Sequence, residues 1–167
     1  MSVSVIGRPR MPDGYGVVES GPLLDWQTVE VRLVESLHYW LSTTRPDGRP
    51  HVVPRWGVWV DDKFFYDGSP QTRHARNLEL NSHCALHLED GEAATMLEGI
   101  STVPDPVVGE LGAQLSEEYI RKYEKLGYAP GPDAWSGEAA GGLHVLTPIS
   151  VIAWSQFPTD VTRFGFA

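Results

Sequence analysis

The sequence has a single cysteine, Cys84, in a chain of 167 residues, which excludes an intrachain disulfide and a cysteine-based zinc site. We interpret Cys84 as a small buried apolar side chain, with a catalytic thiol as the alternative. Apolar runs are also short, and none approaches the roughly 18–20 residues that span a bilayer. The N-terminal stretch MSVSVIGRPRMPDGYG lacks the apolar core of a signal peptide, so we expect a cytoplasmic protein.

Several catalytic and binding motifs are missing as well. The sequence contains no H-E-x-x-H metal motif, no G-x-S-x-G nucleophile elbow, no G-x-G-x-x-G loop and no Walker A loop. His83 and His87 share one face of a predicted strand, but about 13 Å of strand separates them, which is too far for two ligands of one ion. These absences argue against a metal site, hydrolase chemistry and dinucleotide binding, and we nominate no catalytic side chain.

The charge that is present is unevenly distributed. The chain has a net charge of −9, which argues against general nucleic-acid binding. Six of its 13 Lys and Arg residues nevertheless lie between Arg45 and Arg76, against four Asp residues in the same segment. A local basic cluster in an acidic protein favours a small anionic ligand, and scattered solvated charge is the alternative.

The pattern of residues predicts a mainly β domain at residues 25–167, preceded by a loose Gly- and Pro-rich arm at residues 1–24. Asp25 suits the N-cap of a helix whose apolar positions recur every four residues from Val29. Strands are expected at residues 39–44, 51–60, 63–66, 84–88, 93–103, 143–154 and 161–166. Such hairpin-linked strands are typical of an antiparallel barrel with helices at its edge.

Prolines and glycines mark the first hairpin of this barrel. Pro46 and Gly48 suit a tight turn after the first strand. Pro54 lies inside the second strand and lacks an N–H group, so this strand is expected to lie at an edge or to carry a bulge.

A second helix is predicted to begin at Ser69 as N-cap, with Pro70 in its first turn, and to end at Asn81. The first turn of a helix presents free N–H groups and a partial positive charge. The residues at this turn add hydroxyl and basic donors, namely Thr72, Arg73, His74 and Arg76. The helix start therefore suits a phosphate, and an ordinary surface helix with solvated arginines is the alternative.

The clearest helical pattern covers residues 107–126. One face is apolar, with Leu111, Leu115, Tyr119, Tyr123 and Leu126. The other face carries the charged residues Glu117, Glu118, Arg121 and Lys122. We interpret this segment as a packing helix. The long loop at residues 128–142 is expected to be functional or disordered, and Trp135 indicates that part of it packs.

Two stretches, WLSTTRPDGRPHVVPRWGVW at residues 40–59 and FYDGSPQTRHARNLELN at residues 65–81, resemble the pyridoxamine 5'-phosphate oxidase-like superfamily of FMN-binding split barrels. Within it, the chain is most similar to flavin/deazaflavin oxidoreductases that use coenzyme F-420. Trp154 and the closing TRFGF at residues 162–166 extend the resemblance to about residues 25–167. The resemblance implies a six- or seven-stranded split β-barrel that acts as a homodimer, with two cofactor sites at the interface.

The resemblance also assigns cofactor contacts. The strand residues beside the ring system would be Val53, Pro54, Arg55 and Trp56. The residues that flank the ring and the ribityl chain would be Tyr66, Asp67 and Gly68. The phosphate would be held by Thr72, Arg73 and His74, with Arg76 behind them.

The chain departs from the family pattern at three points. His74 replaces a usual Lys, which would make its phosphate contact depend on pH. Arg55 replaces a common Val and adds a cation, and Phe164-Gly165 replaces a Trp-Arg pair, which weakens the case for a cofactor role of the C-terminus. The oxidase's own C-terminal arginine motif is absent, so oxidation of pyridoxamine phosphate itself is not expected.

The leading hypothesis is therefore a reductase in which coenzyme F-420 passes hydride to a small organic acceptor. One alternative is an FMN-dependent oxidase or reductase on the same fold. A second alternative is a non-catalytic carrier that binds a flavin or a tetrapyrrole. Each hypothesis involves a small molecule, and none involves nucleic acid or a membrane.

Overall fold

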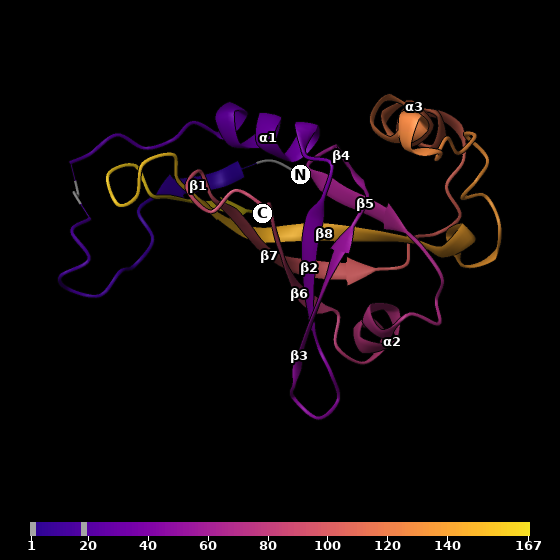
Figure 1. The fold of residues 1–167 in the computed structure, drawn as a ribbon, viewed down its shortest axis with the longest axis horizontal. Coiled ribbons are helices and arrows are strands. Elements are labelled where there is room, and N and C mark those ends of the chain that lie inside the picture. The colour runs from indigo at the N-terminus through magenta and orange to yellow at the C-terminus, as the bar shows by residue number, and fades with distance from the viewer. Residues whose placement is uncertain (1–2, 18–19) are drawn as a thin grey trace.

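The computed structural model describes residues 3–17 and 20–167, and within them nine strands form one antiparallel sheet (Figure 1). Along the sheet the strands follow the order β1-β9-β8-β7-β6-β2-β3, while β5 pairs with both β4 and β8. In the view of Figure 1, α1 lies above the sheet, α2 below it and α3 to one side. The mainly β architecture expected from the sequence is confirmed.

The strands are β1 (Val3–Gly7), β2 (Tyr39–Thr44), β3 (Pro50–Arg55), β4 (Val58–Val60), β5 (Lys63–Asp67), β6 (His83–His87), β7 (Thr95–Thr102), β8 (Leu143–Ala153) and β9 (Thr162–Phe166). The helices are α1 (Trp26–Glu35), α2 (Arg73–Leu80) and α3 (Gly109–Tyr123), with short 3-10 turns at Glu124–Leu126 and Glu138–Gly142. In the described part of the chain, every helix is too short or too polar to cross a membrane.

The long strand β8 is the seam at which the sheet splits. One edge of β8 pairs with β7 along residues 145–153. The other edge is shared, because β5 pairs with residues 143–146 and β9 pairs with residues 150–153. The β4–β5 hairpin therefore leaves the plane of the remaining strands and curls the sheet into a split barrel.

The second predicted strand, residues 51–60, is two strands in the structure. Its first part, β3, forms an antiparallel hairpin with β2 and lies at the edge of the sheet, as the position of Pro54 predicted. Its second part, β4, pairs with β5 instead. The break falls at Trp56 and Gly57, where a Cβ atom on Gly57 would lie 2.5 Å from the Phe65 carbonyl oxygen and overlap the Phe64 ring. A residue with no side chain is required there, and it interrupts the ladder.

The N-terminal residues differ from expectation. Residues 3–7 form β1, which pairs with β9, so this part of the predicted loose arm is wrong. The β-branched residues of VSVIG favour a strand, and the edge of β9 offers unpaired hydrogen-bonding groups for it to pair with. Residues 1–2 and 18–19 of the arm lie outside the described residues, and the boundary at residue 24 stays a prediction.

Helix α2 begins later than the sequence predicted. Ser69 and Pro70 precede the helix, and Thr72 is its N-cap residue. The Ser69 hydroxyl accepts the Gln71 N–H at 3.2 Å, and the Ser69 carbonyl accepts the Thr72 N–H at 3.1 Å. These bonds close a local turn, and serine turns of this kind compete with helix starts for the same residue type.

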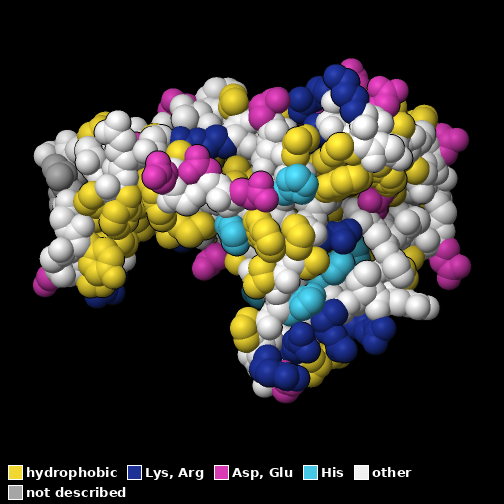
Figure 2. Space-filling view, in the orientation of Figure 1, with side chains coloured by type: hydrophobic (Ala, Val, Ile, Leu, Met, Phe, Trp, Pro, Cys, Tyr) yellow, Lys and Arg dark blue, Asp and Glu magenta, His cyan; other side chains and the backbone are white. Residues whose placement is uncertain are grey.

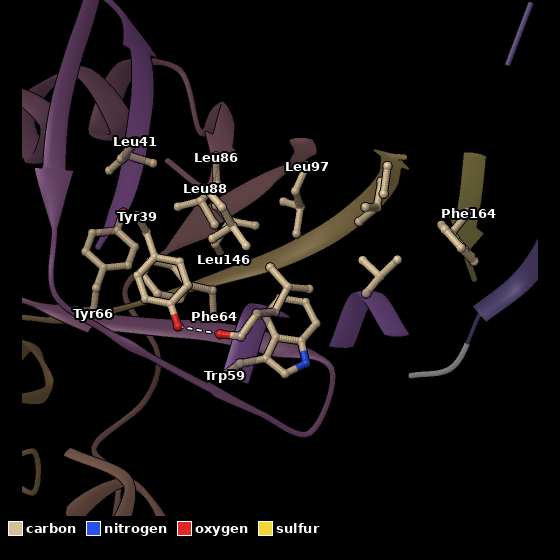
Figure 3. Close-up of a cluster of buried hydrophobic side chains, with 14 of the residues drawn as sticks. Tyr39, Leu41, Trp59, Phe64, Tyr66, Leu86, Leu88, Leu97, Leu146 and Phe164 are labelled. Atoms are coloured by element: carbon tan, nitrogen blue, oxygen red, sulfur yellow. Dashed lines mark hydrogen bonds between the residues drawn. The ribbon is translucent and has the colours of Figure 1, made fainter. Parts of the chain in front are cut away.

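The core consists of two buried clusters. Figure 3 shows the first, in which Tyr39, Phe64 and Leu97 from three strands meet inside the barrel. The second lies between the β4–β5 hairpin and α3, where Tyr119 and Trp135 are fully buried. Burial of each such side chain contributes about 1.5–3 kcal/mol of stability, so α3 and the loop that follows it are firmly attached to the hairpin.

Burial along residues 107–126, which form α3 and the 3-10 turn after it, differs from prediction at two positions. Lys122, placed on the exposed face by its charge, is buried and only 8% exposed, whereas Leu126 is exposed. Lys122 follows Tyr119 by three residues, and residues three and four apart share one helix face. The buried face is therefore wider than the apolar pattern alone indicates.

The break at Gly57 gives a testable prediction for stability. Gly57→Ala should lower the free energy of unfolding by about 1–3 kcal/mol, because the added methyl group overlaps Phe64 and Phe65. Urea denaturation measures the change. Gly131→Ala is the matched control, since a Cβ atom at Gly131 meets no atom within 4 Å; equal stability of the two variants would contradict the packing argument.

Candidate functional site

A pocket of about 310 Å³ opens where the strand break meets the end of β5. It is lined by Pro54, Arg55, Trp56, Asp67 and Tyr128. Four of these five residues are among those that the family resemblance assigned to a cofactor. Tyr128 was not assigned, and its only sequence signal is an aromatic residue at the start of a Gly- and Pro-rich loop.

Trp56 forms an aromatic wall of the pocket. Its ring stacks on Tyr123 with the ring centroids 5.0 Å apart and an interplanar angle of 13°. Tyr128 approaches the same indole at 6.4 Å. Trp56 is still 36% exposed, so its ring is accessible to a planar ligand.

Arg55 lies beside this wall, and its backbone ends β3. Its guanidinium donates a hydrogen bond to the backbone carbonyl of Asp67 and lies 5.8 Å from the centre of the Tyr66 ring. A Cβ atom on Gly68 would meet the Arg55 Nη2 atom at 2.8 Å, so the glycine permits this close approach. The Arg55 Nε atom is buried and has no hydrogen-bond partner among the described residues.

Asp67 fastens the loop at residues 128–142 to the barrel. Its carboxylate accepts hydrogen bonds from the Tyr128 hydroxyl and from the Trp135 indole N–H, the latter at 3.0 Å. Burial, followed by the contact with Asp67, raises the pKa of Tyr128 above its usual value, so its hydroxyl keeps its proton at neutral pH. The loop is thus ordered and forms one side of the pocket.

Tyr66 and Val53 do not line the pocket. Tyr66 is fully buried, stacks on His144 at 5.2 Å and shares a 2.7 Å hydrogen bond with the Ser101 hydroxyl. Val53 is half-buried and packs against the barrel core. Tyr66 therefore supports Arg55 from the interior, and a direct contact of either residue with a ring stays a prediction.

His74 lies in the interior of the protein, close behind the start of α2. It is only 3% exposed, and its Nε2 atom lies 3.2 Å from the Thr72 hydroxyl oxygen. Burial, with further contributions from Arg55 and two histidines, lowers the pKa of His74 to about 4. His74 is therefore neutral at pH 7, so it would meet a phosphate as an uncharged donor, and that contact stays a prediction.

A group of Lys and Arg side chains gathers around the β2–β3 turn and α2, at the bottom of Figure 2. Arg73 is exposed. The pKa of His51 is lowered first by burial of the imidazole and then by the charges of Arg45 and Arg73, so both arginines lie near that side chain. Arg45 and Arg73 form no ion pair with any described carboxylate, and the Arg45 Nε atom is buried without a hydrogen-bond partner among these residues. Uncompensated cations of this kind fit an anionic group.

Arg76 has a structural contact instead. Its guanidinium donates to the Gln71 carbonyl at 2.6 Å and so holds the turn before α2. A contact of Arg76 with a phosphate stays a prediction.

Other chemical groups do not form a second centre in the described residues. No three His, Cys, Asp or Glu side chains there are grouped so that they could hold a metal ion. Burial raises the pKa of the Cys84 thiol to about 12, and its sulfur lies 3.8 Å from the Gly99 carbonyl oxygen. This protonated, half-buried thiol agrees with the interpretation of Cys84 as a packing residue.

The fold is that of a split barrel, with a candidate pocket where β3 ends. The sequence model of the pyridoxamine 5'-phosphate oxidase family matches residues 27–140, and the chain belongs to this family. The family resemblance of the two central motifs is thereby confirmed. A search among curated proteins found no match.

Solved structures share the fold. An F-420 reductase is 20% identical over 84% of this chain and 98% of its own, with a TM-score of 0.53. A heme storage protein from Vibrio cholerae is 23% identical over 75% of this chain and 90% of its own, with a TM-score of 0.55. A heme-binding protein from Mycobacterium smegmatis is 15% identical over 81% of this chain and 57% of its own, with a TM-score of 0.59.

The buried His74 predicts a specific loss of stability in acid. The unfolded chain binds a proton at this histidine near pH 6.5, whereas the folded protein binds it near pH 4. The free energy of unfolding should therefore decrease as the pH drops from about 6.5 to about 4. In His74→Gln this decrease should be smaller by about 1–3 kcal/mol.

Urea denaturation at a series of pH values between these limits measures the effect. His83→Gln, at an exposed histidine, is the matched control and should retain the wild-type pH dependence. An unchanged acid profile in His74→Gln would show that folding does not change the pKa of this histidine.

The Asp67 contacts predict that the loop depends on one carboxylate. Asp67→Ala removes the acceptor of both Tyr128 and Trp135 and should speed amide hydrogen exchange in residues 128–142 about tenfold or more. Asp133→Ala, which removes an exposed carboxylate from the same loop, should leave exchange unchanged. Wild-type exchange in Asp67→Ala would mean that packing of Trp135 alone holds the loop.

Proposed function

We propose that the protein is an oxidoreductase that binds coenzyme F-420 and transfers hydride to a small organic acceptor. The observation that carries the proposal is an accessible indole, Trp56, beside the Arg55 guanidinium at one end of β3, with the unpaired cations Arg45 and Arg73 near His51 at the other end. A cofactor with a planar ring and a phosphate matches this combination. Membership of the pyridoxamine 5'-phosphate oxidase family and the fold of an F-420 reductase support it.

The anionic end of the cofactor would lie by the start of α2. Arg73 is exposed there and can form charge-assisted hydrogen bonds to a phosphate. The buried Nε atom of Arg45 lacks a partner in the described structure, and an anion would satisfy it. Thr72 contributes its hydroxyl, which lies at the boundary of the helix.

The ring would lie along Pro54, Arg55 and Trp56. Trp56 can stack on one face of a planar ring, and Tyr123 behind it keeps the indole in place. When bound, a deazaflavin supplies the hydride chemistry. The protein orients the ring and, through Tyr128 and the attached loop, limits access of water to the pocket.

The choice of coenzyme F-420 over FMN rests on additional positive charge. The deazaflavin carries an anionic lactyl-glutamyl tail beyond the phosphate, and Arg45 offers a cation without an ion-pair partner in the described residues. Arg49, in the same turn, is already paired with Asp47 at 2.7 Å and contributes less. The proposal includes a homodimer with the cofactor sites at the subunit interface, as the family resemblance implies.

Tetrapyrrole binding is the second candidate. It is favoured by the shared fold with the heme storage protein and the heme-binding protein, and by the half-buried His51 on β3, the strand that ends at the pocket. A carrier of this kind would bind its ligand without turnover.

Titration of the purified protein with coenzyme F-420, FMN and hemin, followed by absorbance and fluorescence, separates these functions. We expect coenzyme F-420 to bind most tightly. Arg73→Ala should raise its dissociation constant about tenfold or more, because a charge-assisted contact to the phosphate is lost. Arg10→Ala, at an exposed arginine of the N-terminal segment, is the control and should bind as wild type does.

Other outcomes lead to other assignments. Tight FMN binding without binding of the deazaflavin would replace the proposed reductase with an FMN-dependent enzyme. Binding of hemin alone would favour the carrier. An unchanged dissociation constant in Arg73→Ala would show that the phosphate is held elsewhere.

A further inference from the structure

Lys122 on α3 is a buried amine with no acidic partner. Its Nζ atom donates to the Tyr39 hydroxyl at 2.7 Å and to the Gly57 carbonyl at 3.0 Å. The same atom lies 4.7 Å from the centre of the Tyr39 ring and 5.4 Å from that of Tyr123. Among residues 3–17 and 20–167, no carboxylate lies within ion-pair distance of it.

The neighbouring arginine takes the acidic groups instead. Arg121 pairs with Glu35 at 3.2 Å and with Glu118 at 2.9 Å on the surface. Burial of an ammonium group costs several kcal/mol unless it is well paired. Lys122 therefore takes no part in the surface ion pairs of α3. Its hydrogen bonds to Gly57 and Tyr39 indicate a different role.

The hydrogen bonds around Gly57 identify what Lys122 supplies. The Gly57 N–H donates to the Tyr123 hydroxyl at 3.0 Å. That hydroxyl also lies 2.8 Å from the Gly57 carbonyl oxygen and 2.9 Å from the Leu37 carbonyl oxygen. A phenol has only one proton to donate, so Tyr123 cannot satisfy both carbonyls. Lys122 provides the second donor, which leaves the Tyr123 proton free for Leu37.

These bonds fix the backbone directly behind the pocket. Gly57 follows Trp56, whose ring stacks on Tyr123 and lines the pocket. At the break between β3 and β4, no neighbouring strand holds Gly57, so side chains of α3 do so. The orientation of the indole wall consequently depends on Lys122.

We propose that Lys122 is a positioning residue for the pocket, which holds the strand break at Gly57 and thereby sets the plane of the Trp56 ring for a planar ligand. The effect on the ligand rests on the proposed function, whereas the effect on Trp56 does not. Lys122 itself is buried behind the wall and does not line the pocket.

The same contacts make the wall sensitive to pH. Burial, with Arg121 second, lowers the pKa of Lys122 to about 7. The groups around it are Tyr39 from β2, Tyr123 and Glu118 from α3, and Glu35 from α1. Below pH 7 the charged amine makes charge-assisted hydrogen bonds and cation–π contacts, and above it the neutral amine binds the same partners less strongly. Trp56 should therefore be held more firmly at pH 6 than at pH 9.

A first experiment needs no ligand. The indole N–H resonance of Trp56 is assigned in ¹H–¹⁵N spectra by its absence from Trp56→Phe. In the wild-type protein it should shift with a midpoint near pH 7. In Lys122→Met it should be displaced and no longer titrate. Lys125→Met, at an exposed lysine three residues later, should retain the wild-type titration.

A second experiment separates the ring from the phosphate. Riboflavin has the ring without the phosphate, and FMN has both. Lys122→Met should raise the dissociation constants of both about tenfold, since the wall contacts the ring. Arg73→Ala should raise that of FMN and leave that of riboflavin unchanged.

These outcomes distinguish the two proposals. If the wild-type protein binds neither riboflavin nor FMN, the titration with coenzyme F-420 still decides the proposed function, and the Trp56 resonance alone decides the role of Lys122. A Trp56 resonance that stays constant from about pH 6 to about pH 9 in the wild-type protein would overturn the pH dependence of the wall, even where Lys122→Met does not fold. Equal effects of Lys122→Met and Lys125→Met on this resonance would overturn the positioning role.

Discussion

The interruption of the second strand at Trp56 and Gly57 is the feature on which the rest of the structure depends. If residues 51–60 continued along β2, the β4–β5 hairpin could not reach β8, and the barrel would remain open. The broken ladder leaves backbone groups that a strand would normally satisfy. Tyr123 and Lys122 from α3 satisfy them, so a helix replaces the missing strand.

The same interruption joins the core to the candidate site. Trp56 is held in the pocket wall because α3 fixes the adjacent Gly57 and because Tyr123 stacks on the indole. Asp67, at the end of β5, holds the loop at residues 128–142 on the other side of the pocket. The chain is acidic overall, but arginines are concentrated at the start of α2 and at the β2–β3 turn, which lies at the other end of β3 from the pocket. In the proposed function, the ring and the anionic tail would meet these different parts of the protein.

Features that depend on neighbouring residues were predictable from the sequence, whereas features that depend on distant residues were not. Pro46 and Gly48 determine the hairpin turn within four residues, and Gly48 indeed has a positive φ of 82°. Ser69 was misassigned as a helix cap because the same hydroxyl also closes a serine turn, and only the surrounding backbone selects between them. Lys122 was assigned to solvent because charge usually indicates exposure, whereas its partners come from β2 and the strand break.

The sequence by itself determined the mainly β class, the hairpin order, the edge position of β3 and the family, because these depend on local turns, strand periodicity and two contiguous motifs. Only the tertiary structure decided the split of residues 51–60, the burial of His74 and Lys122, and the contribution of Tyr128 to the pocket. Each of these depends on groups far apart in the chain, whose approach is set by packing around β8 and α3. Local sequence patterns do not predict this packing. The protonation state of a side chain, for example, depends on the neighbours that the fold brings to it.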